Sequence, residues 1–333
     1  MDTKTLETIL TTYGPTGHED RISSVLRDLV APYADEVYND KLGNLIALKR
    51  GVSGKKIMLS AHMDQIGLVV VAIDEKGFLR VANVGGVNAP LSAGHQVVFE
   101  NGTRGAVYFE RNEKGVGEVK MNNLFVDIGA ESREEAEKLV NVGDMCVFAG
   151  RFALMGNRLS CSTLDDRICC AALVEAIQKA RSEHDVYYVF TVQEEVGLRG
   201  AGTAAYAIEP DLGISLDVTG TGDVPEALPM AVELGKGPTV KVMDSSVIVP
   251  PAVRRFMENA AAEAGIPFQR EVLRGGGTDT GAVQRTRGGV PAGCISIGTR
   301  YIHSPVETCD MRDYENAVKL LCACLERKEL PIA

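Results

Sequence analysis

The chain has 333 residues, more than the ~100–200 residues of a usual domain, so two domains or one large one are expected. Hydrophobic residues make up 45% and charged residues 24% of the sequence, which is ordinary for a globular protein with a full-sized core. The formal net charge is −10, and no run of Lys or Arg is long enough to follow a phosphate backbone. The composition therefore argues against nucleic-acid and anionic-membrane binding.

The sequence also favours a cytoplasmic location. The first residues, MDTKTLETIL, lack the basic and apolar regions of a signal peptide. The longest apolar stretches, such as Leu68–Ile73, are far shorter than the ~20 residues that a membrane-spanning helix needs. The eight cysteines include no C-x-x-C pair, so reduced thiols are expected.

In chain order, the pattern first predicts two helices and a buried strand. Residues 2–13 and 19–33 carry apolar positions at helical spacing and are separated by the breaker run GPTG. Ile57–Ala61 is a short apolar run, which is typical of a buried parallel strand.

Between residues 68 and 157 the pattern changes to short strands. Leu68–Ile73 and Phe78–Val81 flank one turn, and Val97–Glu100 and Ala106–Glu110 flank another that contains Asn-Gly. Each pair predicts a β-hairpin. We therefore expect residues 68–157 to form a small β-rich domain inserted into a larger one.

After residue 158 strands and helices alternate. We expect helices at 166–181, 199–207, 251–264 and 311–326, and strands at 186–192, 212–216, 239–243 and 292–297. Such alternation predicts an α/β fold with a mixed, mostly parallel sheet and helices on both faces. Residues 1–67 and 158–333 together would form this larger domain.

Side chains that can bind metals follow the buried strands of the α/β domain. They are His62 after 57–61, Glu194 and Glu195 after 186–192, Asp217 after 212–216, and His303 six residues after 292–297. In open α/β sheets the ligand crevice lies outside the carboxyl ends of the strands, so we expect these side chains to meet there. Asp165 joins them from just before a helix, whose positive dipole end favours a carboxylate.

Each of these features has an ordinary structural explanation when it is taken alone. A Glu-Glu pair usually lies on a solvated surface, an Asp pair before a helix is usually an N-cap with its neighbour, and a lone histidine is usually not a ligand. Convergence of two histidines and three acidic sites on one edge of the sheet favours a metal site. With Asp64 and Glu194 included, five carboxylates would face one crevice, and two divalent cations would relieve their repulsion.

Six motifs now make the sequence recognisable. They are AHMDQIG (61–67), STLDDR (162–167), QEEVGLRGA (193–201), SLDVT (215–219), GGGTDTGA (275–282) and RYIHSPVE (300–307). In this order they closely resemble the tetrahedral aminopeptidase family, which includes glutamyl and deblocking aminopeptidases among the cocatalytic metallopeptidases. The resemblance spans essentially the whole chain. It implies a peptidase-type α/β domain interrupted by a β-rich dimerisation domain.

The resemblance also implies roles for particular residues. Asp165 matches the carboxylate that bridges two metals, with His62 and Asp217 completing one site and Glu195 and His303 the other. Glu194 matches the general base and Asp64 the acidic residue behind the first histidine. Imidazole and carboxylate ligands without a thiolate suit zinc most, with cobalt and manganese as alternatives.

The implied reaction is removal of N-terminal residues from short peptides by a two-metal-activated water, with Glu194 accepting its proton. Relatives build tetrahedral twelve-chain particles, which implies a homo-oligomer assembled from dimers. One departure from the family is Cys169, where relatives commonly carry glycine, so a thiol is expected near the bridging aspartate.

Other functions remain open at this point. A carboxypeptidase or N-deacylase can use the same metal core, and carboxylate pairs also cleave glycosides. The absence of Trp and the 5% aromatic content give few stacking surfaces for sugars. A binding protein that kept the fold is a further alternative, although Glu194 and the whole ligand set are present. Residue preference depends on Arg274, which would favour acidic residues if it pointed into the pocket and neutral ones such as Leu or Met otherwise.

Overall fold

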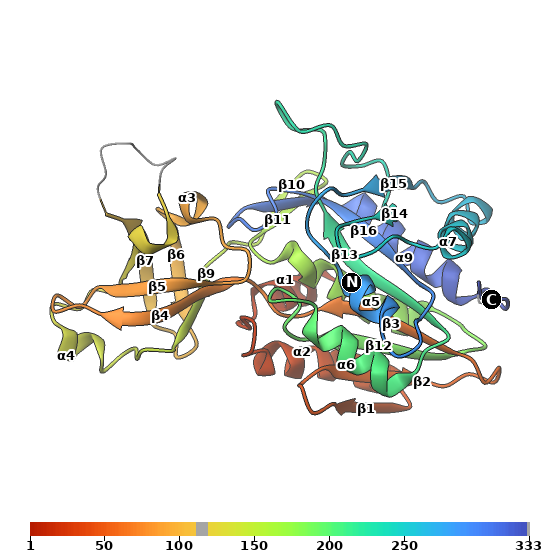
Figure 1. The fold of residues 1–333 in the computed structure, drawn as a ribbon, viewed down its shortest axis with the longest axis horizontal. Coiled ribbons are helices and arrows are strands. Elements are labelled where there is room, and N and C mark those ends of the chain that lie inside the picture. The colour runs from red at the N-terminus through yellow and green to blue at the C-terminus, as the bar shows by residue number, and fades with distance from the viewer. Residues whose placement is uncertain (111–118, 332–333) are drawn as a thin grey trace.

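The computed structural model describes residues 1–110 and 119–331. A large mixed sheet covered by helices forms one part of the molecule, and a small β-barrel stands beside it (Figure 1). The barrel is built from a continuous stretch of chain that leaves the large sheet after β3 (Lys56–His62) and returns at β10 (Ala153–Met155). The expected α/β fold with a β-rich insertion is confirmed, while the boundaries of the two domains remain a prediction.

The large sheet has eleven strands. Its main path runs β1 (Glu36–Asn39), β2 (Leu45–Lys49), β12 (Asp185–Thr191), β3, β13 (Leu212–Thr219), β16 (Ala292–Arg300), β17 (Glu307–Asp310), β11 (Arg158–Cys161) and β10. The central strands β12, β3, β13 and β16 are parallel to their neighbours in that group. Off this path, β14 (Thr239–Met243) pairs with β16 and with β15 (Gln269–Val272). The carboxyl ends of the four central strands therefore lie at one edge.

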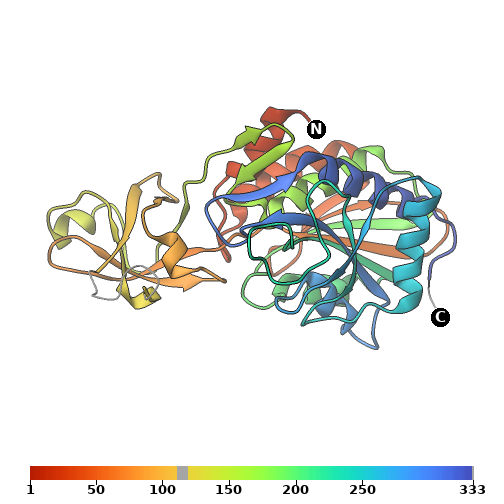
Figure 2. The ribbon, with the colours of Figure 1, turned by 90° about the horizontal axis from the view of Figure 1, so that it is seen from above.

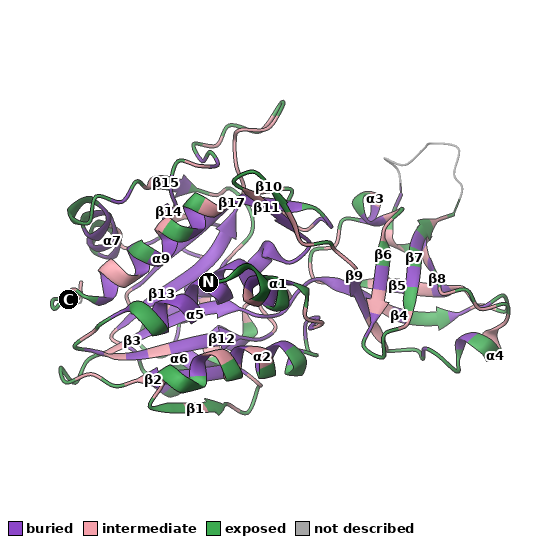
Figure 3. Ribbon diagram, turned by 180° about the vertical axis from the view of Figure 1, so that it is seen from behind, coloured by how far each residue is buried: buried purple, intermediate pink, exposed green. Residues whose placement is uncertain are grey.

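Helices cover both faces of this sheet, as expected from the alternating pattern (Figure 3). One face carries α1 (Thr3–Thr11), α2 (Asp20–Val30), α5 (Leu164–Lys179), α7 (Pro251–Glu263) and α9 (Met311–Leu325). The other carries α6 (Arg199–Ile208) and α8 (Asp279–Gln284). Helix α5 is buried from Leu164 to Ile177, which agrees with its unbroken apolar run from Ile168 to Val174.

The barrel closes in the order β4 (Gly67–Ile73), β5 (Leu79–Val84), β8 (Leu124–Asp127), β7 (Arg104–Phe109), β6 (Gln96–Phe99) and β9 (Met145–Phe148). Seen from above, it projects sideways from the sheet domain (Figure 2). It has an apolar core of its own, which includes Leu68, Val97 and Val126. Both hairpins expected from the sequence are present, as the β4–β5 and β6–β7 pairs.

Several short elements complete the fold. They are α3 (Ala89–Ser92), α4 (Arg133–Ala136) and the 3₁₀ turns Ala31–Tyr33 and Met121–Asn123. All eight cysteines are free, in agreement with the expected reduced thiols. Within residues 1–110 and 119–331, no helix combines the length and apolar character that crossing a bilayer requires.

Candidate metal centre

The six candidate side chains with metal-ligand or base chemistry line one cavity of about 550 Å³, and they are His62, Asp165, Glu194, Glu195, Asp217 and His303. His62 is the last residue of β3, and Asp217 lies near the end of the parallel strand β13. Glu194 and Glu195 follow β12, and His303 lies between β16 and β17. The strand ends thus bring together the residues that the sequence predicted to meet.

Asp165 lies between the two histidines. Its Oδ1 is 3.0 Å from Nε2 of His62, and its Oδ2 is 3.3 Å from Nε2 of His303. His303 Nε2 is also 3.2 Å from Oε2 of Glu195. A carboxylate that directs one oxygen towards each of two imidazoles has the arrangement that a bridging metal ligand needs.

The other ring nitrogen of His62, Nδ1, contacts Asp64. His62 Nδ1 is 3.1 Å from the backbone oxygen of Asp64 and 3.4 Å from its Oδ1. Because a histidine that donates through Nδ1 keeps Nε2 free to bind a metal, this contact favours the tautomer required of a ligand. Asp64 is fully buried, as expected for the acidic residue behind the first histidine.

His303 is held in an uncommon conformation. Its backbone has a φ of 60°, in the left-handed region that non-glycine residues seldom adopt. A Cβ on Gly86, which follows β5, would lie only 2.5 Å from Nδ1 of His303. Any larger residue at that position would displace the His303 ring, and Gly86 itself lines the cavity.

Asp166 is a site residue that the sequence analysis did not select. His62, Asp166 and Asp217 form one group whose ligand atoms lie within 4.8 Å of one another, and His62, Asp165 and Glu195 form a second. Asp166 Oδ2 accepts a 3.1 Å hydrogen bond from the backbone N–H of His62. The position of Asp166 next to Asp165 in the STLDDR motif could have indicated a site residue, but an N-cap residue and its neighbour explain two adjacent aspartates before a helix equally well.

Cys169, the departure from the family pattern, is buried on α5 beside the Asp166 carboxyl. Burial, together with the negative charge of Asp166, raises the pKa of the Cys169 thiol well above its usual range. A protonated thiol is a poor metal ligand, so the imidazole and carboxylate donors remain the ligand set that the site offers.

The carboxylates of the site repel one another. Burial raises the pKa of Glu194 well above its usual range, and the nearby charges of Asp217 and Asp279 add to that effect. Burial and the charge of Asp165 do the same to the pKa of Asp217. Burial would lower the pKa of His303, but hydrogen bonds to Asp165 and Glu195 raise it to about 12. The cluster thus holds more negative charge than its own histidines can balance.

The donor set fits divalent cations. Glu195 Oε1 and Asp166 Oδ1 are buried oxygens without a hydrogen-bond partner. Unpaired buried carboxylate oxygens are costly unless a cation or a donor satisfies them. Imidazole nitrogens and carboxylate oxygens around one cavity are suitable ligands for zinc, cobalt or manganese.

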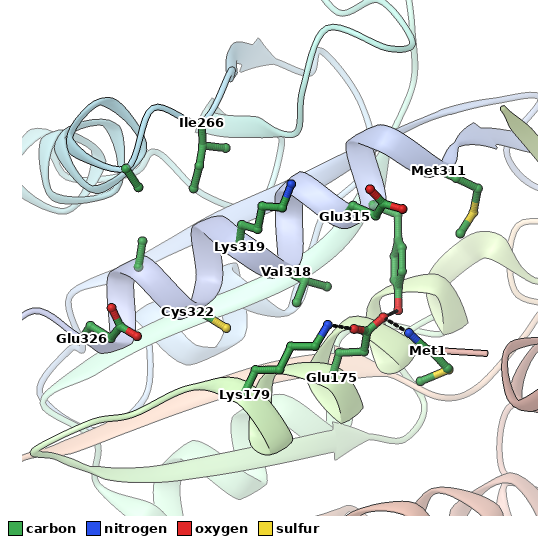
Figure 4. A pocket seen from close by; sticks show the side chains of 13 residues that line it. Met1, Glu175, Lys179, Ile266, Met311, Glu315, Val318, Lys319, Cys322 and Glu326 are labelled. Atoms are coloured by element: carbon green, nitrogen blue, oxygen red, sulfur yellow. Dashed lines mark hydrogen bonds and ion pairs between the residues drawn. The ribbon is translucent and has the colours of Figure 1, made fainter. Parts of the chain in front are cut away.

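A second cavity, of about 620 Å³, lies between α5 and α9, away from these residues (Figure 4). Its buried carboxylate, Glu175, already accepts hydrogen bonds from the Tyr314 hydroxyl at 2.8 Å and the Met1 amino group at 2.7 Å. Lys179 adds an ion pair to the same carboxylate. With its charge balanced in this way, this cavity lacks the uncompensated polar groups of the metal-ligand cluster.

Comparison with known proteins places this chain among the metal-dependent hydrolases. Residues 43–320 match the M42 glutamyl aminopeptidase family. A putative aminopeptidase of Acetivibrio thermocellus is 50% identical over 92% of this chain and 93% of its own. The lysyl aminopeptidase of Pyrococcus furiosus is 40% identical over 98% and 97% of the two chains.

Solved structures agree with this relationship. The TET1 peptidase of Pyrococcus horikoshii, which can assemble into a tetrahedron or a large octahedral shell, superposes with a TM-score of 0.87 at 35% identity. The match covers 97% of this chain and 99% of that one. The chain therefore belongs to the M42 glutamyl aminopeptidase family, whose members hydrolyse peptide bonds and use divalent metal ions.

Proposed function

We propose that this protein is an aminopeptidase that holds two divalent cations and releases N-terminal residues from short peptides. The proposed ligands are His62, Asp165, Glu195, Asp217 and His303, with zinc as the first choice of metal and cobalt or manganese as alternatives. The observation that carries the proposal is the position of the Asp165 carboxylate, whose Oδ1 lies 3.0 Å from Nε2 of His62 and whose Oδ2 lies 3.3 Å from Nε2 of His303.

Glu194 is the proposed general base. Two divalent cations, when bound, would supply the positive charge that acidifies water and stabilises a developing oxyanion. The Glu194 carboxylate lines the cavity, and its Oε2 is 3.8 Å from Nε2 of His62. It can therefore accept the proton of a water that attacks the scissile carbonyl and return that proton to the leaving amine.

The walls of the cavity favour an uncharged N-terminal residue. Apolar side chains line it beside the acidic cluster, and they are Leu198, Val218, Leu273 and Ile302. No Lys or Arg of the described chain lines it, and the Arg274 side chain is exposed. Without a basic partner an acidic substrate side chain would be left unpaired, so we propose a neutral preference such as Leu or Met. The Pyrococcus furiosus relative is a lysyl enzyme, so lysine belongs in the comparison.

The free α-amine of the substrate supplies the second element of selectivity. The acidic cavity attracts the positive charge of a peptide N-terminus. An N-blocked peptide lacks that charge and should be a poor substrate. A carboxypeptidase or an N-deacylase would not require a free amine, and this difference separates the proposed activity from its alternatives.

We further propose that residues 68–157 form a dimerisation domain and that dimers assemble into a tetrahedral dodecamer. The assembly of the Pyrococcus horikoshii relative supports this. Exposed apolar side chains on the barrel strands, Val71 on β4 and Tyr108 on β7, provide contact area on this domain. In a closed particle, only short or unfolded chains would reach the metal-ligand cluster.

An activity panel tests the proposal. Purified protein loaded with zinc, cobalt or manganese is assayed on the p-nitroanilides of Leu, Met, Lys and Glu, and on acetyl-Leu-p-nitroanilide as the matched N-blocked control. We expect the fastest hydrolysis with Leu or Met and almost none with the acetylated compound. Equal rates on free and acetylated substrates would refute aminopeptidase activity. A preference for Lys or Glu would refute only the proposed pocket preference.

A further inference from the structure

Glu307 lies behind the site and belongs neither to the predicted ligand set nor to the cavity lining. Its Oε2 accepts a 3.0 Å hydrogen bond from the backbone N–H of Asp165, and its Oε1 accepts a 2.8 Å hydrogen bond from the backbone N–H of His303. The residue is only 1% exposed. One carboxyl group thus contacts two proposed ligand residues, Asp165 and His303, that lie far apart in the sequence.

We propose that Glu307 is a positioning residue that fixes Asp165 and His303 relative to each other, and that it thereby sets the affinity of the metal pair. This inference rests on the proposed function, because it takes both residues to be metal ligands. Glu307 is not proposed as a ligand, since both of its oxygens are directed at backbone donors.

The strand pairing explains why Glu307 reaches both residues. It is the first residue of β17 and lies opposite Cys161, the last residue of β11. The chain continues from β11 into α5, where Asp165 lies, while the loop before β17 carries His303. Glu307 therefore lies in the β11–β17 pair, to which both segments are joined: the start of α5 follows β11 and carries Asp165, and the loop before β17 carries His303.

Both backbone donors need a partner that local structure does not give. Asp165 has non-helical angles at the start of α5, where helix N–H groups lack a partner within the helix. His303 has a positive φ, a conformation that persists only when the surroundings impose it. Each oxygen of the Glu307 carboxyl group accepts one of these two N–H groups, so a single buried side chain satisfies both donors.

Asp64 plays the same part on the other side of the site. Its Oδ1 accepts from the backbone N–H of Glu194 at 3.0 Å, and its Oδ2 accepts from that of Glu195 at 3.3 Å. Two buried carboxylates, Asp64 and Glu307, therefore each anchor two residues of the site through their backbones. Asp64 also contacts the His62 ring, whereas Glu307 acts through N–H groups alone.

The test compares Glu307→Gln with a matched control, Glu175→Gln. Glu175 is 5% exposed and accepts a hydrogen bond from Tyr314, so this change also replaces a buried glutamate with glutamine, but away from the metal-ligand cluster. The first readout is amide hydrogen exchange of the metal-free proteins at Asp165 and His303. The second is Co²⁺ affinity, measured by titration against a chromophoric chelator.

Glutamine keeps one acceptor oxygen and directs an NH₂ group at the other donor, so we expect Glu307→Gln to speed exchange at one amide or at both. Cobalt binding should weaken by ~10–100-fold at one of the two sites, with a smaller change at the other. The larger loss of cobalt affinity should occur at the metal site that the His303→Ala substitution removes. Glu175→Gln should change neither readout. If Glu307→Gln does not fold, Glu307→Asp, which keeps the charge but shortens the side chain, is expected to give the same pattern.

Wild-type exchange and wild-type affinities in Glu307→Gln would overturn the inference. So would equal losses in Glu307→Gln and Glu175→Gln, because they would indicate a general effect of replacing a buried glutamate with glutamine. Failure of the proposed function is a different result, namely wild-type protein that binds fewer than two cations per chain.

Discussion

The backbone N–H of Glu194 donates a 3.0 Å hydrogen bond to Oδ1 of Asp64. Asp64, which contacts the His62 ring, therefore also fixes the start of the segment that carries the proposed base, Glu194. The Oδ2 atom of Asp64 accepts a 2.7 Å hydrogen bond from the Thr16 hydroxyl, which ties the N-terminal part of the chain to the same residue. Changes at Asp64 should consequently affect the ligand and the base together.

Asp64→Asn tests this coupling. The amide keeps one acceptor oxygen but directs an NH₂ group at a donor, so we expect activity or metal affinity to fall by ~10–100-fold. The measurement is kcat together with metal content. Asp74→Asn is the control, because Asp74 also accepts two backbone N–H groups, from Lys76 and Phe78, but in a barrel turn. Equal effects of the two substitutions would show that Asp64 has no special role.

Substitutions at the neighbouring glutamates should separate proton transfer from metal binding. Glu194→Gln preserves the side-chain shape and removes the proton acceptor, so turnover should fall by ~100-fold or more with both metals retained. Glu195→Ala and His303→Ala each remove a proposed ligand and should instead lower metal occupancy. Kinetics and elemental analysis of the same preparations provide the comparison. Near-normal turnover of Glu194→Gln would mean that another group is the base.

Removal of the metals should reduce both activity and stability. Protein reloaded after purification should approach two divalent ions per chain, and a chelator should abolish activity until zinc, cobalt or manganese is added. Cations that bind only the folded state stabilise it by roughly 4 kcal/mol at a concentration a thousandfold above Kd. Differential scanning calorimetry should therefore show a lower Tm for the chelated protein. Full activity after exhaustive metal removal would contradict the proposed mechanism.

Glu19 should make stability depend on pH. Burial raises its pKa from 4.5 to about 7, despite hydrogen bonds from the backbone N–H groups of Gly17 and Gln193. The folded state then keeps a proton that the unfolded state loses between pH 4.5 and 7, so this residue lowers stability as pH rises through that window. Relative to wild type, Glu19→Gln should gain up to roughly 3 kcal/mol between pH 5 and pH 8.

Urea unfolding of the metal-free proteins at the two pH values measures this difference. Glu7→Gln, which makes the same chemical change at an exposed position on α1, is the control. A stability difference between Glu19→Gln and wild type that is independent of pH would show that Glu19 does not hold a proton in the folded protein.

The assembly can be examined by sedimentation. We expect metal-loaded protein to sediment as a large homo-oligomer and chelated protein to include smaller species such as dimers. A monomer at micromolar concentration with both metals bound would exclude the proposed dodecamer.

Much of the site could be predicted because the central strands are buried on both faces and are therefore continuous apolar runs. His62 and Asp217 stand at the ends of such runs, where sheet geometry requires ligands to meet. Short strands with polar residues gave no such signal. Strand β1 (EVYN) lies at the edge of the sheet and β17 (ETCD) lies between β16 and β11, and the sequence analysis included neither.

Glu307 and Asp166 show the limit of this reasoning. Both lie inside motifs that identified the family, yet each accepts a hydrogen bond from a backbone N–H group more than a hundred residues away. Nothing in the local pattern distinguishes a buried acceptor from a solvated acid. The exposure of Arg274 likewise depends on the path of its loop, which glycines leave undetermined in sequence.

The closed barrel has a consequence for how copies of this chain can join. Among the described residues, each of its six strands pairs with a neighbour on both sides along at least part of its length, which limits the edge that a strand from another molecule could join. Contacts through the barrel strands should therefore be made mainly by side chains. A few surface substitutions could then weaken or redirect the association without breaking a hydrogen bond of the barrel itself, so assembly state and fold stability can change independently.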